Sequence, residues 1–173
     1  MGRWGLCCLS LICCLLLVAC SPSLNWREVQ LGSLRTLLPC KPDTGSRPVV
    51  LGGQTLKMDM IGCEAGGALL AISRVQATDA VQAAKLMAML RQASLDQVGS
   101  VAVHPRPNSG DEKTSYDVQV DGSRSKGLPL QVRFKWLLAE ADVYQMAVYA
   151  QRLSPELTDN LTNEARIYQA GVR

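Results

Sequence analysis

The sequence predicts an α+β domain in which an antiparallel β-sheet carries two amphipathic helices packed on one face. Three observations predict this fold. Apolar and polar residues alternate strictly over residues 128–138, which is the period of a half-buried strand. One helical stripe of apolar residues runs through residues 83–93, and a second follows Ser154-Pro155. Because the sheet and both helices have an apolar face, stacking the helices on the sheet buries all three.

The chain begins with the pattern of an export signal. Arg3 supplies a positive charge, and residues 6–18 form an apolar run of 13 residues that only Ser10 interrupts. A membrane-spanning helix needs about 20 apolar residues, so this run is too short to span. Residues 1–19 are therefore predicted to be a leader, and they are left out of the fold prediction.

Leu17-Val18-Ala19-Cys20 closes that run and resembles the lipobox of bacterial lipoprotein precursors. The resemblance implies that Cys20 becomes the first residue of the mature chain and carries acyl groups such as palmitate. Two or more acyl chains hold a protein stably at a bilayer. Ser21, in place of Asp, favours by the same resemblance the periplasmic face of the outer membrane of a Gram-negative cell. An ordinary secreted protein, cleaved nearby, is the alternative.

Residues 20–25 are then a lipidated cysteine with a short tether, and residues 26–173 form a single domain. Removing residues 1–19 from 173 leaves 154 residues, the size of one ordinary domain. Arg3 leaves with the leader, so the formal charge of +3 falls to +2. So small a charge argues against a nucleic-acid partner.

Cys40 and Cys63 are the thiols that remain once the leader is removed and Cys20 is acylated. In an oxidising compartment an isolated pair of this kind most often forms a disulfide. Two free thiols are the alternative. A metal site is not expected, because His104 is the only histidine that could complete one.

The first half of the domain reads as a strand meander followed by a helix. Strands are expected at residues 33–38, 49–61 and 68–75, and a loop with two prolines at residues 41–48. Thr78 or Asp79 is suited to cap the helix that follows, and this helix is expected to end before Gly99.

The second half adds further strands and a closing helix. Short strands are expected at residues 98–103 and 116–120, separated by a loop that contains His104. The long strand over residues 128–138 pairs with residues 143–150 as a hairpin. Ser154-Pro155-Glu156 favours a helix start, and Gly171 is a plausible stop.

This order of elements resembles the PsbP-like α/β sandwich, which small exported bacterial lipoproteins also use. The stretches that carry the resemblance are Asn25–Val29, Leu37–Pro42, Gly62–Ala65 and the final hairpin with its helix. The resemblance implies an accessory or binding role in a larger assembly. It transfers no functional residue, because no motif of known role is matched.

No sequence motif for catalysis or cofactor binding is present. The chain lacks the nucleophile elbow, the phosphate-binding loop, the dinucleotide fingerprint and the metalloprotease motif. His104 has no nucleophile or carboxylate at a suggestive spacing, so a surface histidine is expected. The sequence therefore predicts no cofactor and no enzyme, with a hydrolase as the remote alternative.

One basic surface is a candidate for partner binding. Arg133 and Lys135 lie on the polar side of the long strand, and Arg124 and Lys126 lie in the preceding loop. Such a face suits an acidic envelope protein or lipid headgroups, and an ordinary solvated face is the alternative. We expect a lipid-anchored periplasmic accessory protein. The alternative function is small-ligand binding or envelope-stress sensing, in a pocket between helix and sheet.

Overall fold

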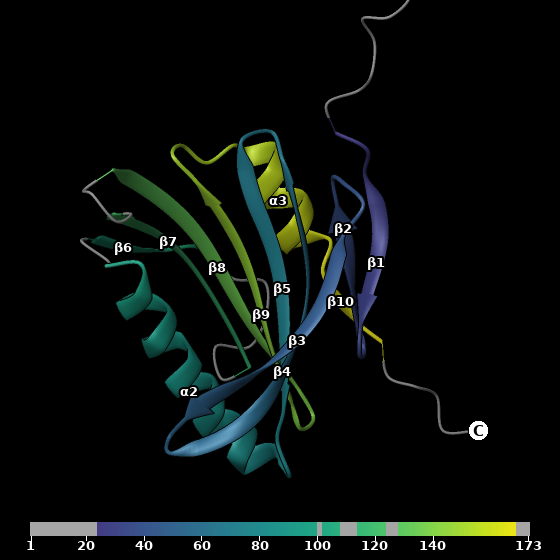
Figure 1. Ribbon diagram of the computed structural model, residues 1–173, viewed down its shortest axis with the longest axis vertical. Helices are drawn as coiled ribbons and strands as arrows, with labels where there is room; N and C mark the ends of the chain where they lie inside the picture. The colour runs from purple at the N-terminus through teal and green to yellow at the C-terminus, as the bar shows by residue number, and fades with distance from the viewer. Residues whose placement is uncertain (1–23, 100–101, 108–113, 124–127, 169–173) are drawn as a thin grey trace, which may run out of the picture.

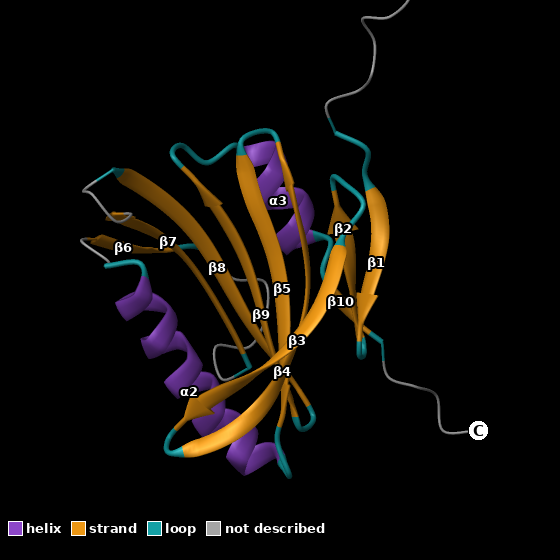
Figure 2. Cartoon of the chain, in the orientation of Figure 1, coloured by secondary structure: helices purple, strands orange, loops and turns teal. Residues whose placement is uncertain are grey.

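The computed structural model describes residues 24–99, 102–107, 114–123 and 128–168. Within these ranges the fold is α+β, with a seven-stranded and a three-stranded antiparallel sheet (Figures 1 and 2). The larger sheet has the order β3-β4-β5-β9-β8-β7-β6. Its strands are β3 (Asp43–Leu51), β4 (Gln54–Ala65), β5 (Ala68–Gln76), β6 (Ala102–Pro105), β7 (Ser115–Ser123), β8 (Pro129–Ala139) and β9 (Asp142–Ala150). The predicted long hairpin is confirmed as β8 and β9.

The small sheet is formed by β1 (Arg27–Leu31), β2 (Leu34–Leu38) and the two-residue β10 (Arg166–Ile167). The turn between β1 and β2 requires a glycine. Gly32 has φ 59°, and a Cβ on it would lie 2.5 Å from the Tyr144 hydroxyl oxygen. The turn therefore places β1 and β2 directly against the larger sheet.

Two helices pack against the larger sheet, α2 (Ala80–Gln97) and α3 (Pro155–Asn163). The predicted cap of α2 is confirmed, because Asp79 Oδ1 accepts a hydrogen bond of 2.8 Å from the Gln82 amide. Asp79 caps the helix from an exposed position, because the N-terminal end of a helix attracts negative charge. No helix in the described ranges combines the length and the apolar character needed to cross a membrane.

The α+β class is confirmed, but the placement of both helices on one face is wrong. Residues of β9 alternate between two hydrophobic clusters: Val143 and Ala147 pack beneath α2, while Met146 and Val148 pack beneath α3 and the small sheet. The helices therefore lie on opposite faces of the sheet. The physical reason is that the central strands are apolar on both faces, so each face needs its own cover.

Both clusters are built from residues 24–165. Fully buried side chains occur in each, with Trp136 and Phe134 beneath α2 and Tyr144 and Leu161 on the opposite face. A chain of this length buries enough surface to hold its own core. The described residues thus supply the hydrophobic clusters on both faces of the sheet.

Three local predictions differ from the structure. Most of the expected loop at residues 41–48 belongs to β3, an edge strand whose outer position tolerates Pro48. His104 lies in β6 and not in a loop. The last helix ends at Asn163, well before Gly171, because Arg166 and Ile167 pair with β2.

Candidate functional site

The two basic residues predicted on an open sheet face are buried. Arg133 is 3% exposed and Lys135 is 7% exposed, because α3 covers them. The Arg133 guanidinium donates to both Asp117 carboxylate oxygens, at 3.0 and 2.9 Å, and pairs with Asp159 of α3. Strand alternation identifies a polar face correctly, but it does not tell what covers that face. The expected docking surface at Arg133 and Lys135 is therefore wrong.

The environment of these cations is that of a structural core. Burial by itself lowers the pKa of Arg133, but hydrogen bonds and charge from Asp117 and Asp159 outweigh it, and the net shift is upward. Lys135 donates 2.9 Å to the carbonyl oxygen of Thr162, near the end of α3. Its pKa is lowered, chiefly because burial disfavours the charged form. The two side chains fasten α3 to the sheet.

Three other predicted site residues, Cys20, Arg124 and Lys126, lie outside the described residues. The acylation of Cys20 and the partner-binding role of the two loop cations therefore stay predictions.

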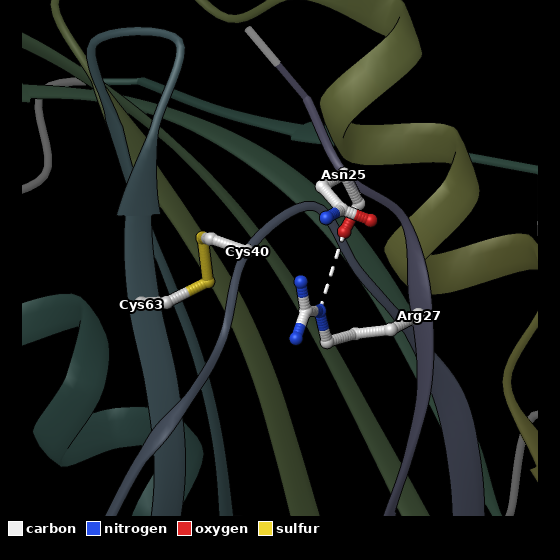
Figure 3. Close-up of a disulfide and its surroundings, with 4 residues drawn as sticks. All are labelled: Asn25, Arg27, Cys40 and Cys63. Carbon is white, nitrogen blue, oxygen red and sulfur yellow. Dashed lines mark hydrogen bonds between the residues drawn. A yellow bond between two sulfur atoms is a disulfide. The ribbon is translucent and has the colours of Figure 1, made fainter. Parts of the chain in front are cut away.

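The predicted disulfide between Cys40 and Cys63 is confirmed, with the two Cα atoms 6.0 Å apart (Figure 3). It joins the segment after β2 to β4, and so ties the small sheet to the larger one. The backbone amide of Asn25 donates a 2.8 Å hydrogen bond to the carbonyl oxygen of Pro39, the residue before Cys40. The point where the chain enters the fold is thus held beside the disulfide.

His104 has a carboxylate partner that the sequence analysis missed. Its Nε2 lies 3.0 Å from Asp121 Oδ2, and Gln131 donates to the other oxygen of Asp121. Both side chains of the pair are about half exposed. Pairing of β6 with β7 brings the residues together across 17 positions, and a hairpin prediction for these strands would have found them. Within the described part of the chain no hydroxyl or thiol is hydrogen-bonded to the ring.

An open groove of about 830 Å³ lies where the small sheet meets the β8–β9 turn. Several of its polar groups contact each other, while Arg35 Nε and Asp142 Oδ1 are buried without a hydrogen-bond partner among the described residues. Asp142 pairs with Arg74 at 2.9 Å and accepts a hydrogen bond from Tyr144, whose hydroxyl also accepts from the Ser33 amide. These contacts join the two sheets. Among the described residues no three His, Cys, Asp or Glu side chains are grouped to hold a metal ion.

A second groove, which we call the α2 groove, lies between α2 and strands β3, β4, β5 and β9. It has a volume of about 500 Å³. Side chains of the sheet form the floor and α2 forms one wall, and most of the lining is apolar. The lining includes Val49, Met60, Leu69, Ala71, Ala93 and Tyr149. Small ligands occupy clefts of about 300–1,000 Å³ with a mainly apolar lining and a few polar groups.

Polar side chains interrupt this apolar lining at several points, among them Arg47, Gln145 and Tyr149. Arg47 of β3 is exposed and makes no ion pair with any residue of the described ranges. Tyr149 packs edge-on against Phe134 at 5.7 Å, and its hydroxyl has no hydrogen-bond partner among the described residues. Gln145 accepts hydrogen bonds from Ser94 and Trp136, which positions its amide at the base of the groove.

The sequence analysis did not single out Arg47 or Tyr149. Tyr149 belongs to the register 143, 145, 147, 149 on the α2 side, whereas the alternation noted for this strand was that of Tyr144, Met146 and Val148. Arg47 fell in a predicted loop. An edge strand so rich in polar residues shows no alternation of polar and apolar residues. Only the pairing of β3 with β4 places Arg47 beside Met58.

No protein-family model matches the chain, and none of the curated proteins matches it.

Proposed function

We propose that this protein is a lipid-anchored binding protein of the bacterial envelope. Cys20 is its acylated residue, the periplasmic side of the outer membrane is its location, and the α2 groove is its binding site. The observation that carries the proposal is the α2 groove itself: an open apolar cleft whose rim holds a cation without an ion-pair partner among the described residues.

Two further observations support a binding role in the envelope. The Cys40–Cys63 disulfide suits an oxidising compartment such as the periplasm. The resemblance to PsbP-like domains, which act mainly as accessory or binding proteins, favours binding over catalysis. The groove between helix and sheet now favours the ligand-binding alternative over docking through the polar sheet face, because Arg133 and Lys135 are covered.

The location is tested by replacing Cys20 in the full chain. We expect Cys20→Ala to accumulate as unprocessed precursor and to leave the lipoprotein pool labelled by a palmitate analogue. Cys14→Ala is the matched control, because it removes a leader cysteine outside the lipobox and should be processed normally. Unchanged processing and labelling of Cys20→Ala would contradict the anchor.

Binding in the groove is tested by a photo-crosslinking amino acid placed on α2 in intact cells. Position 93 lies in the groove wall, while position 84 is an exposed alanine of the same helix that does not line it. We expect a defined crosslinked adduct from position 93 and none from position 84. Equal adducts from both positions, or none from position 93, would contradict the proposed site.

A further inference from the structure

We propose that the α2 groove binds a single acyl chain that carries an acidic headgroup, with the headgroup at Arg47 and the chain along the sheet. This inference rests on the proposed function and names the class of ligand that the groove takes.

The floor of the groove suits a flexible apolar chain. Ala71 of β5 and Ala147 of β9 pair with each other and line the groove, so this part of the floor carries only methyl side chains. Ala93 continues this small-residue lining on the wall formed by α2. Met60 lies beside the floor, and methionine side chains adapt to irregular apolar ligands. Leu69 is 40% exposed at one end, where a bound chain would remove it from water.

Charge along the groove selects a headgroup and an orientation. Arg47 is the cation of the groove, and the half-buried Tyr149, whose pKa is raised by burial and lowered in smaller part by the charge of Arg47, adds a hydroxyl within reach of that charge. Around Leu69 lie one cation and two carboxylates, Lys41, Asp43 and Glu64, whose charges nearly balance. An acidic headgroup is therefore drawn to Arg47 rather than to the Leu69 end. Guanidinium pairs with carboxylate or phosphate are charge-assisted and often bidentate.

The position of the groove suits a ligand drawn from the membrane. Leu24 packs 3.7 Å from the place of a Cβ on Gly66, in the turn between β4 and β5, and Leu69 follows three residues later. The chain enters β1 at the same end of the molecule as this turn (Figure 1). Leu24 comes four positions after Cys20, a reach of about 14 Å when extended. A chain acylated at Cys20 thus holds the Leu69 end of the groove close to the bilayer.

The test uses residues 21–173, exported behind a cleavable leader so that the disulfide forms without the lipid anchor. Dodecanoate and dodecyltrimethylammonium, which share a chain length and differ in headgroup charge, are titrated below micelle formation and followed by amide chemical shifts. We expect saturable binding of dodecanoate, with shifts in β3, β5, β9 and α2, and affinity at least about tenfold weaker for the cation, since charged hydrogen bonds contribute that much.

Four exposed positions supply the variants. Arg47→Glu should weaken dodecanoate at least about tenfold and strengthen dodecyltrimethylammonium, a reversal that a merely structural role would not produce. Ala93→Phe should block both probes by filling the groove. Arg152→Glu and Ala84→Phe make the same changes away from the groove and should leave dodecanoate affinity within about twofold.

The outcomes separate the sources of the ligand. If lysophosphatidylglycerol binds with the same variant pattern, the ligand is a membrane lipid; if dodecanoate alone binds, it is a free fatty acid. Either result supports the inference. Absence of saturable binding to both acidic probes, equal affinity for the cation, or indifference to Arg47→Glu would overturn it. Such a failure leaves the Cys20 and crosslinking results intact, so it is distinct from a failure of the proposed function.

Discussion

Two sites on opposite faces of the seven-stranded sheet treat their polar side chains in opposite ways. Beneath α3, Arg133 and Lys135 are buried, and α3 supplies acceptors for both. On the α2 side, Arg47 and the Tyr149 hydroxyl border an open groove and have no hydrogen-bond or ion-pair partner among the described residues. One face has been closed by its helix, and the other has been left partly open. Polar groups that a fold completes internally stabilise it, whereas those it leaves unpaired beside an apolar cleft are available to a ligand.

The largest expected effect comes from breaking the closed face. Arg133→Met leaves the carboxylate of Asp117, whose side chain is 2% exposed, without its cation. Removing one partner of a buried pair typically costs about 3–5 kcal/mol, because the remaining charge is buried without compensation. We expect that loss in the free energy of unfolding measured with urea.

Lys57→Met is the matched control for this variant. Lys57 forms a 2.8 Å pair with Asp59 but is 71% exposed, so its loss should cost less than about 1 kcal/mol. If the two variants lost equal stability, burial would not decide how much an ion pair contributes to this fold.

The second effect concerns the link between the small sheet and the closed face. Replacing Cys40 and Cys63 with serine removes a crosslink that spans 23 residues, which should cost about 3 kcal/mol through the entropy of the unfolded chain. Hydrogen exchange should rise most in β1 and β2 and least in α2. Uniform acceleration of exchange in all elements would show that the disulfide does not act on one face in particular.

The third effect tests the base of the α2 groove. Gln145→Leu removes the acceptor of the Trp136 indole N–H, a 2.9 Å hydrogen bond from a fully buried side chain. An unsatisfied buried donor costs about 1–3 kcal/mol. We expect that loss of stability, together with a changed tryptophan emission spectrum. Ser94→Ala, which keeps the Trp136 contact, should cost less.

The smallest effect is a pH dependence from the closed face. The pKa of Lys135 is lowered in the folded state, mainly by burial, from an ordinary value of 10.5. Between the lowered folded value and 10.5 the unfolded chain binds more protons, so stability rises with pH across that window. In Lys135→Met this rise should be lost. Unfolding of both proteins from about pH 8 to 10.5 measures the difference, in which the tyrosine titrations common to both cancel.

Much of the fold was predictable from the sequence because the signals were local. The alternation in β8 and β9, the capping carboxylate of Asp79 and the paired cysteines each depend on a few neighbouring residues. The α+β class followed from them. Placement of the helices did not, since Tyr144, Met146 and Val148 revealed one apolar side of β9 while Val143 and Ala147 made the other apolar as well.

The candidate site was not predictable in the same way. Arg133 and Lys135 have the same sequence signature whether water or α3 covers them. Arg47 and Tyr149 are 102 positions apart in the sequence and become neighbours only through the pairing of β3, β4, β5 and β9. Long-range pairing of this kind leaves no trace in the spacing of residues.

The disulfide has a mechanical consequence for any force that pulls on the chain before Leu24. Such a load enters β1 first, and β1 and β2 can peel away one hydrogen bond at a time. Peeling stops at Cys40, because Cys63 ties it covalently to β4. The freed segment of about 16 residues then extends by roughly 55 Å. Beyond that length the tension passes through the disulfide into β4, the second strand of the seven-stranded sheet. The segment before Cys40 therefore extends under load while the sheet behind the disulfide stays folded.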